Sequence, residues 1–507
     1  MPLSQALAEV LSDPRLDGAL VGARVDSLAS GRTLFAVEPQ RLLNPASVTK
    51  VFTTAAALCL LHPAYRFRTE IYTLRDPEDG VLAGPLYVKG HGDPFLVNER
   101  LIFLTHELKS LGIARIKGPL VLDDSYFDGM AEGPGWTQDD SPRPYMARMG
   151  ALSLNFNTAA VLVFPGERVG QPARLEMMPD CDHFELDNRT RTGNRRTRLR
   201  LDVARCGNRT RVMAWGRVSR HHRGSRHYVR VTAPSWYFGR SLRHFLRAAG
   251  IRTRRAVRRG AVPRWADKLY VLSSPALGEL VRKVNKRSQN FMAEQLFKVI
   301  GAELLGPPAS WYKGQQAMNA FLAEEVGIPP GSYVLHNGSG LNDVNRVSAS
   351  QAVQVLRAMW QRFDVRPDFV ASLAVAGTDG TVARRFRHPA LRREMRLKTG
   401  SLEQVRALAG YVHTRGDETL AFCLLINRYR CDSGEVIQLI NRFASTLARA
   451  DADHTVVDQV LVEPVDPLPI APPIQGPGPV EGHEDALVPY GEKGLYPPPE
   501  PDRDAED

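Results

Sequence analysis

The sequence contains little cysteine and no long hydrophobic run. Only five of its 507 residues are cysteine, too few for a disulfide framework, and they lack the C-x-x-C spacing of a zinc site. The longest apolar stretch, Val51 to Leu61, is interrupted by two threonines and is far shorter than the ~18 residues that span a bilayer. We therefore expect no metal, no cofactor and no transmembrane segment. Cys181 and Cys206 lie in one region, where they either pair or remain free thiols.

The N-terminus also lacks the features of a secretory signal. Residues 1–10 contain no basic segment, no continuous apolar segment and no small-residue cleavage site, so no signal peptide is expected in the sequence as printed. With 43% hydrophobic and 24% charged residues, the composition is that of an ordinary folded protein. The length suggests about two to four domains.

One segment has no lysine and almost no acid. From Arg189 to Arg264 there are 23 arginines and a single acid, Asp202, so the segment carries about +22 in a chain whose net charge is +11. Residues 462–507 carry eleven acids, two basic residues and twelve prolines. This composition predicts a Pro-rich, acidic, disordered tail. The rest of the chain is nearly neutral.

Hydrophobic periodicity predicts a fold that mixes helices and strands. Two β-branched runs at 19–28 and 33–37 predict a hairpin, and an apolar, alanine-rich helix follows from about Pro45 to Leu61. Residues 65–264 have short strand-like runs with glycine and proline turns, which predicts a β-rich insertion. Helical patterns return at 275–326. Strand-like runs at 394–398, 407–414 and 418–427 precede a final helix at 435–450.

Ser47-Val48-Thr49-Lys50 places a hydroxyl and an amine three residues apart. On a helix these positions share a face, so the amine of Lys50 can act as a base toward the hydroxyl of Ser47. Roughly one or two Ser-x-x-Lys sequences are expected by chance in a chain of this length. Ser310 to Lys313 is indeed a second copy, but it lies in an apparent loop, whereas the apolar turns after Ser47 would bury Lys50.

Two further motifs follow in the chain. Lys398-Thr399-Gly400 lies at the end of a strand-like run and offers a cation, a hydroxyl and then a position without a side chain; about 0.1 copies are expected by chance. Ser288-Gln289-Asn290 offers a hydroxyl and an amide at the start of a helix, where a serine is most often only an N-cap. The order Ser-x-x-Lys, Ser-x-Asn, Lys-Thr-Gly is typical of the penicillin-interacting serine enzymes.

With these motifs the chain resembles the D-alanyl-D-alanine carboxypeptidase/endopeptidase family, the low-molecular-mass class C penicillin-binding proteins. The resemblance extends from about residue 18 to 450. It includes Gly90-His91-Gly92-Asp93-Pro94, residues 152–157, Gly338-Ser339-Gly340-Leu341, residues 345–348, residues 376–381 and residues 408–411.

The resemblance implies an α/β fold of the α+β type, in which an antiparallel, transpeptidase-like sheet is covered by helices. It also implies a large β-rich insertion between the Ser-x-x-Lys and Ser-x-Asn motifs. We accordingly predict a discontinuous domain at 1–64 and 266–456 and an inserted region at 65–265. Within the insertion, about 75–147 would form a nested subdomain.

The resemblance further implies cleavage of peptidoglycan stem peptides through an acyl-enzyme that β-lactams also form. Ser47 would be the nucleophile, Lys50 its base and Ser288 the proton relay. The substrate-binding residues would be Asn290, Lys398, Thr399, Gly400 and Ser401. Asp343 and Glu403 occupy places that bind the stem-peptide side chain in relatives, and two acids there would favour an amine-bearing third residue.

Other interpretations predict different behaviour. A β-lactam hydrolase of the same superfamily would release its acyl group within seconds, and a non-catalytic envelope-binding protein would form no acyl-enzyme. The arginine-rich segment, Arg189 to Arg264, has few aromatic residues and no nucleic-acid motif, so no nucleic-acid partner is expected. Anionic envelope polymers, or mere residue-usage bias, are the alternatives for it. The family implies the periplasm or cell envelope, although the sequence shows no signal peptide.

Overall fold

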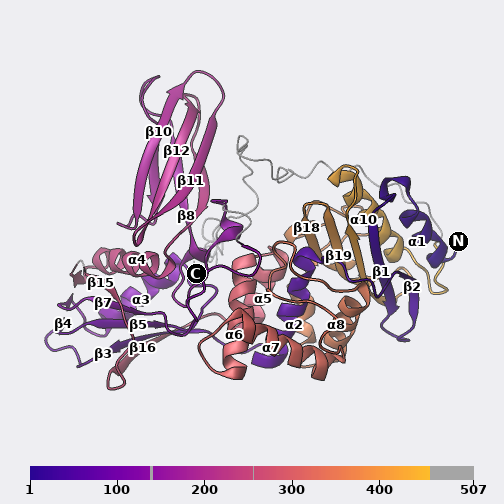
Figure 1. Ribbon diagram of the computed structural model, residues 1–507, viewed down its shortest axis with the longest axis horizontal. Coiled ribbons are helices and arrows are strands. Elements are labelled where there is room, and N and C mark those ends of the chain that lie inside the picture. The colour runs from indigo at the N-terminus through magenta and orange to yellow at the C-terminus, as the bar shows by residue number, and fades with distance from the viewer. Residues whose placement is uncertain (137–140, 255, 457–507) are drawn as a thin grey trace, which may run out of the picture.

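One antiparallel sheet of six strands, on the right of Figure 1, joins the two ends of the chain. The computed structural model describes residues 1–136, 141–254 and 256–456, so the tail predicted at 462–507 lies outside the described residues. The strand order is β17-β18-β19-β20-β1-β2. The strands are β1 (Leu20–Ser27), β2 (Thr33–Val37), β17 (Ala374–Val375), β18 (Met395–Leu402), β19 (Val405–His413) and β20 (Thr419–Asn427). The predicted hairpin and the predicted strands around Lys398 thus form one sheet, which confirms the predicted fold class.

Alternating residues of the central strands build two separate cores. In β19, Ala407, Ala409 and Tyr411 point to the core that includes α2 (Thr49–Leu61) and α8 (Ala349–Gln361). Leu408 and Val412 point to the opposite core, which includes α1 (Leu3–Leu11) and α10 (Ser433–Ala448). A strand that is buried on both faces has a nearly continuous run of apolar residues, and the sequences of β19 and β20 have such runs. Helices therefore cover both faces of the sheet.

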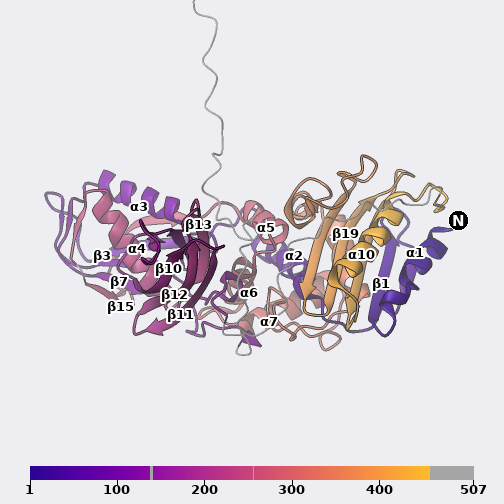
Figure 2. The same ribbon diagram turned by 90° about the horizontal axis from the view of Figure 1, so that it is seen from above.

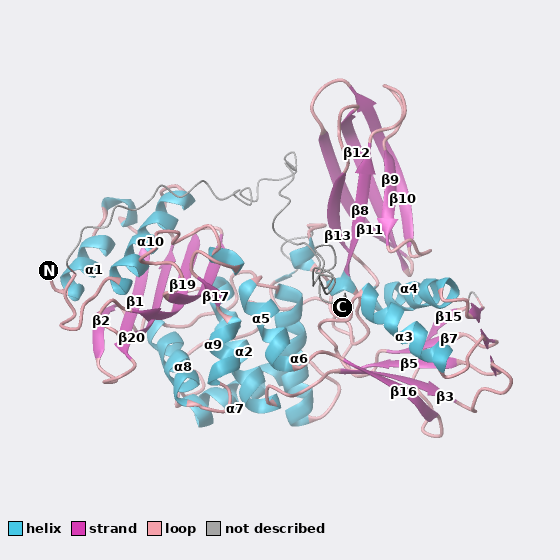
Figure 3. Ribbon diagram, turned by 180° about the vertical axis from the view of Figure 1, so that it is seen from behind, coloured by secondary structure: helices cyan, strands magenta, loops and turns pink. Residues whose placement is uncertain are grey.

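A bundle of helices separates this sheet from the insertion, as Figures 2 and 3 show. Its members besides α2 are α5 (Leu277–Lys286), α6 (Asn290–Leu305), α7 (Trp311–Phe321) and α9 (Arg366–Ser372). α2 is buried almost throughout, because its alanines and threonines allow neighbouring helices to approach on every side. Lys50 is therefore held in the interior of the molecule, beside the partly accessible Ser47.

The insertion is built from four further sheets. Their orders are β15-β7-β5-β3-β16, β14-β6-β4, β10-β12-β11 and β13-β8-β9. The strands are β3 (Arg68–Thr73), β4 (Val81–Leu82), β5 (Leu86–Gly90), β6 (Arg115–Ile116), β7 (Leu120–Asp123), β8 (Thr158–Phe164), β9 (Arg174–Met178), β10 (Phe184–Gly193), β11 (Arg198–Cys206), β12 (Arg209–Ser219), β13 (Ser225–Arg230), β14 (Arg252–Thr253), β15 (Val257–Arg259) and β16 (Asp267–Ser273). The domain boundary at 265/266 stays a prediction; β16, which follows it, pairs with β3.

The insertion also contains two helices that the sequence pattern did not predict, α3 (Asn98–Ser110) and α4 (Pro234–Ala248). α4 buries Tyr237, Phe238 and Leu242 in the core of the insertion. Two of its arginines, Arg240 and Arg243, also lie on the buried face and are only 8% and 7% exposed.

The cysteines and the membrane prediction can now be compared with the structure. All five cysteines are free thiols, so Cys181 and Cys206 do not pair. In the described part of the chain, no helix has both the length and the apolar character needed to cross a membrane.

Candidate active site

The hydroxyl of Ser47 and the amine of Lys50 meet where α2 begins. A short 3-10 turn, Ala46–Val48, leads into the helix, and Lys50 is the second helical residue. Lys50 Nζ lies 2.8 Å from Ser47 Oγ, as the Ser-x-x-Lys spacing predicts for one helix face. Ser47 remains partly accessible while Lys50 is fully buried. A reactive pair with one accessible member and one desolvated member is thus formed by local structure.

Lys50 Nζ has two further partners, and both are oxygens that only accept. It donates to Asn290 Oδ1 and to the carbonyl oxygen of Ser339, each at 2.7 Å. A neutral amine has two N–H groups and one lone pair. An ammonium group donates to all three oxygens, whereas a neutral amine donates to two of them and accepts from the Ser47 hydroxyl. The neutral form is the one that can take a proton from Ser47.

Electrostatics favour the same protonation state. Burial lowers the pKa of Lys50 well below its ordinary value, and the charge of Lys398 lowers it further, while Glu294 opposes the shift. Burial also lowers the pKa of Lys398, to about 7. Both amines are therefore easier to deprotonate than an exposed lysine, and at Lys50 the charge of Lys398 adds to the effect of burial.

Ser288 belongs to the same cluster and is not a helix cap. Gln289 caps α6 instead, because its side chain accepts from the backbone N–H of Phe291. Ser288 has a left-handed backbone with φ 54°, and its Oγ accepts from Lys398 Nζ at 2.9 Å. The Ser-x-Asn motif therefore links the other two motifs, through Ser288 to Lys398 and through Asn290 to Lys50.

Strand β18 brings the third motif against the turn that carries Ser47. Lys398 is buried, and Thr399 Oγ1 donates to Thr381 Oγ1 at 2.8 Å. A Cβ atom on Gly400 would lie 2.6 Å from the carbonyl oxygen of Pro45, closer than real Cβ contacts. The glycine of Lys-Thr-Gly therefore permits close approach of strand and turn. Ser401 is exposed on the strand, and Glu403 is exposed in the turn that follows it.

The second Ser-x-x-Lys sequence has a purely local role. Ser310 is the N-cap of α7, and its Oγ accepts from the backbone N–H of Lys313 at 3.0 Å. The amine of Lys313 donates to the carbonyl oxygen of Gly306 rather than to Ser310. The preference for Ser47 over Ser310 therefore agrees with the geometry.

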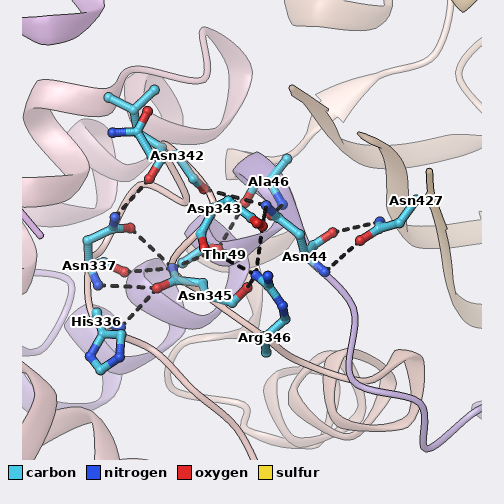
Figure 4. Close-up of polar contacts among 11 residues, drawn as sticks. Asn44, Ala46, Thr49, His336, Asn337, Asn342, Asp343, Asn345, Arg346 and Asn427 are labelled. Atoms are coloured by element: carbon cyan, nitrogen blue, oxygen red, sulfur yellow. Dashed lines mark hydrogen bonds and ion pairs between the residues drawn. The ribbon is translucent and has the colours of Figure 1, made fainter. Parts of the chain in front are cut away.

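Asn44 connects the turn before Ser47 to two distant parts of the chain (Figure 4). Its backbone N–H donates to Asn427 Oδ1 at 2.8 Å, and its Oδ1 accepts from the backbone N–H of Ala46 at 2.8 Å. Its amide nitrogen donates to Asp343 Oδ1, also at 2.8 Å. Asp343 in turn forms an ion pair with Arg346 at 2.8 Å. The carboxylate of Asp343, though 72% exposed, already has two partners.

Glu294 is the site residue that the sequence motifs do not reveal. It is fully buried on α6, where its carboxylate accepts the backbone N–H groups of Gly338 and Ser339 at 3.2 and 2.9 Å. It also accepts from Trp311 Nε1 at 2.8 Å. The carbonyl of Ser339 is one of the acceptors for Lys50, so Glu294 orients a wall of the lysine pocket. The signal available in the sequence is an acid one helical turn after Asn290, among apolar neighbours.

Within residues 1–136, 141–254 and 256–456, no three His, Cys, Asp or Glu side chains gather in a way that would hold a metal ion. The groups that surround Ser47 are amines, amides and hydroxyls.

A serine paired with a buried lysine, beside a Lys-Thr-Gly strand in a helix-covered antiparallel sheet, defines the class of penicillin-binding serine peptidases. Residues 3–447 match the model of the D-Ala-D-Ala carboxypeptidase 3 (S13) family, and the chain belongs to that family. The resemblance inferred from the motifs is thereby confirmed.

Individual relatives cover most of the chain. A D-alanyl-D-alanine carboxypeptidase from Actinomadura sp. (strain R39) is 31% identical over 443 residues, which are 84% of this chain and 81% of the relative. D-alanyl-D-alanine carboxypeptidase DacB from Haemophilus influenzae is 28% identical to this chain. The matched region covers 82% of this chain and 86% of the DacB chain. The crystal structure of penicillin-binding protein 4 (dacB) from H. influenzae has a TM-score of 0.76 at 26% identity, covering 87% of this chain and 98% of that one. A predatory peptidoglycan endopeptidase from Bdellovibrio bacteriovorus, 17% identical with a TM-score of 0.51, shares the fold.

Proposed function

We propose that the protein is a serine-type D-Ala-D-Ala carboxypeptidase and/or endopeptidase that acts on peptidoglycan stem peptides through Ser47. The observation that carries this proposal is the position of Lys50 Nζ, 2.8 Å from Ser47 Oγ and buried against two acceptors. This arrangement supplies a neutral general base to a nucleophile that is accessible from outside.

In the proposed reaction, Ser47 Oγ attacks the carbonyl carbon of the D-Ala-D-Ala bond while Lys50 takes the hydroxyl proton. The tetrahedral oxyanion is bound by the backbone N–H groups of Ser47 and Ser401; losing one such donor typically costs about 3–4 kcal/mol of transition-state stabilisation. Ser288 passes the proton to the leaving D-alanine nitrogen, and the C–N bond breaks. Water then attacks the ester and regenerates Ser47.

The second lysine serves recognition in this proposal. Lys398, with the hydroxyl of Thr399, binds the terminal carboxylate of the substrate, and Asn290 binds its amide. Gly400 leaves room for the substrate backbone along β18. A bound carboxylate stabilises the ammonium form of Lys398, because an opposite charge nearby raises the pKa of an amine.

A fluorescent penicillin tests the nucleophile. We expect it to label the wild-type protein covalently and to leave Ser47→Ala unlabelled. Ser310→Ala is the matched control, because it removes the serine of the second Ser-x-x-Lys sequence and should label normally. Labelling that persists in Ser47→Ala would refute the assignment. Release of the label within seconds would indicate a β-lactam hydrolase, and wild-type protein that takes up no label would indicate a binding protein.

We expect the side-chain preference of the enzyme to depend more on Glu403 than on Asp343. Glu403 is exposed beyond Ser401, whereas the charge of Asp343 is offset by Arg346. Glu403→Ala should lower kcat/KM for peptides with an amine-bearing third residue several-fold relative to neutral ones, in line with one charged hydrogen bond. Asp343→Ala should change this ratio less, and Glu403→Gln should behave as Glu403→Ala does. An unchanged ratio in both alanine variants would exclude these acids from recognition.

We further propose that the enzyme works in the bacterial cell envelope, where its substrate lies, and that its arginine-rich segment contacts anionic polymers there. Support for the second point is electrostatic: Arg189 to Arg264 contain 23 arginines and one acid. Binding to anionic polymers is measured by sedimenting the protein with cell-wall material at increasing salt concentrations. Its binding to duplex DNA at the same salt concentrations is the comparison.

A further inference from the structure

One face of the sheet β10-β12-β11 presents arginines in two adjacent rows. The three strands pair so that Arg191, Arg217 and Arg198 lie directly opposite one another. Two residues along the strands, Arg189 and Arg200 lie on either side of Trp215. Paired residues of a sheet point to the same side, so these six side chains share one face, called here the arginine face. In Figure 1 this sheet projects away from the rest of the molecule.

The opposite face of the same sheet is the structural one. Its residues include Val212, Ala214 and Val218, which are at most 1% exposed and belong to the core of the insertion. The strict alternation means that no residue of the arginine face is needed to fill this core. Arg189, Arg191 and Arg198 are exposed, and the other three members of the face are partly exposed.

The charge of the arginine face is largely uncompensated. Arg189 forms an ion pair with Asp187 at 2.8 Å. Within residues 1–136, 141–254 and 256–456, no carboxylate forms an ion pair with the other four arginines, and the Nε of Arg217 is buried without a hydrogen-bond partner. Like charges directly opposite on neighbouring strands destabilise a sheet. An anion bound between the guanidinium groups would offset this repulsion.

From these observations we infer that the arginine face is a binding site for a phosphodiester polymer. Guanidinium groups bind phosphate in a bidentate manner, and all five cations of the face are arginine. The two rows are about 7 Å apart, since each residue of a strand rises ~3.4 Å, and the three strands span about 10 Å. An extended chain with one charge per repeat can therefore meet a guanidinium in each row.

The extent of the site is defined by acids. The next row along the strands places Asp187 and Asp202 on either side of Met213. These carboxylates repel a polyanion, so its path is confined to the two arginine rows. The choice of an envelope polymer over nucleic acid rests on the proposed function, whereas the site itself does not.

A polymer without bases tests the site. The probe is fluorescent poly(glycerol phosphate), and binding is measured by anisotropy at several salt concentrations. We expect the triple variant Arg191→Ala/Arg198→Ala/Arg217→Ala to bind at least about tenfold more weakly than wild type. The slope of log affinity against log salt concentration should become smaller by about 2–3, because each lost phosphate contact reduces that slope by about one. The control Arg252→Ala/Arg254→Ala/Arg258→Ala removes the same charge from the same arginine-rich segment but outside the face. This control should bind the polymer with an affinity within about twofold of wild type, as expected if the affinity depends on contacts with the arginine face rather than on net charge.

Three outcomes overturn the inference. Equal losses in the two triple variants would show that only net charge matters. Absence of measurable binding by wild type would exclude the site. A charge-matched oligothymidylate that binds more tightly than poly(glycerol phosphate), and whose binding is lost in Trp215→Ala, would identify a single-stranded nucleic-acid site instead. Penicillin labelling of Ser47 should be unchanged in every one of these variants, so failure here is distinguishable from failure of the proposed reaction.

Discussion

Replacing Glu294 with alanine is expected to abolish penicillin labelling and to destabilise the fold. The substitution leaves three buried donors without their acceptor: the backbone N–H groups of Gly338 and Ser339 and the indole N–H of Trp311. Each buried donor left unsatisfied costs about 1–3 kcal/mol, so the free energy of unfolding should fall by several kcal/mol. The measurements are denaturant unfolding and the rate of acylation by a fluorescent penicillin.

Glu294→Gln separates the electrostatic role of the side chain from its structural role. The glutamine amide keeps an acceptor oxygen but removes the negative charge that opposes the pKa shift of Lys50. The pKa of Lys50 should fall further, so the acid limb of the acylation profile should move to lower pH. Glu303→Ala is the matched control: Glu303 is an exposed glutamate on the same helix, and its hydrogen-bond partners are the side chains of Tyr126 and Tyr65. If Glu294→Ala resembled Glu303→Ala in stability and rate, the positioning role would be excluded.

Removing the charge of Lys398 should change the pH dependence of acylation in a defined direction. Lys50 must be neutral to accept a proton, so acylation rises with pH through the pKa of Lys50. The charge of Lys398 lowers that pKa, and Lys398→Met removes this effect, so the acid limb should move to higher pH. The alkaline limb, which reports loss of the Lys398 proton near its pKa of about 7, should disappear.

Lys398→Met should also lower kcat/KM strongly. Lys398 binds the substrate carboxylate in the proposed mechanism, and loss of a charged hydrogen bond costs about 1.5–3 kcal/mol, or roughly 10- to 150-fold in kcat/KM. The measurement is kcat/KM for D-alanine release between pH 4 and 10, as for any general-base reaction. Lys398→Arg retains the charge and serves as the control for the acid limb. An acid limb that does not move in Lys398→Met would show that the two lysines are not coupled.

Sequence reasoning succeeded where the relevant geometry is local. Ser47 and Lys50 lie on one helical turn, so their contact follows from spacing, and the apolar sequence of α2 correctly indicates that Lys50 is buried. No local rule predicts the contact between Ser288 and Lys398, which lie far apart in the sequence. This contact was indicated only by the order of the motifs, through the family resemblance.

The features that sequence reasoning missed depend on tertiary structure. Glu294 looks like an ordinary acid of a helix until the loop at Gly338 and Ser339 is packed against it. Helix α4 was missed because it lies among short strand-like runs and glycine and proline turns, from which the whole segment was interpreted as β-rich. The arginine face needs the register of three strands, and a shift of one residue would turn every arginine into the core.

Strand β1 has a consequence for how the enzyme is made. It lies between β2 and β20. Its pairing with β2 is local, but its other edge, from Leu20 to Ser27, pairs with residues of β20 that are synthesised about 400 residues later. Loop closure over such a separation is slow, and domains fold in the order in which they emerge. The inserted sheets, whose strands are all complete by Ser273, can fold while the N-terminal hairpin still waits for β20. Ability to react with penicillin therefore reports completion of the six-stranded sheet through β20, and a ribosome-bound nascent chain that ends before Thr419 should form its arginine face without forming its active site.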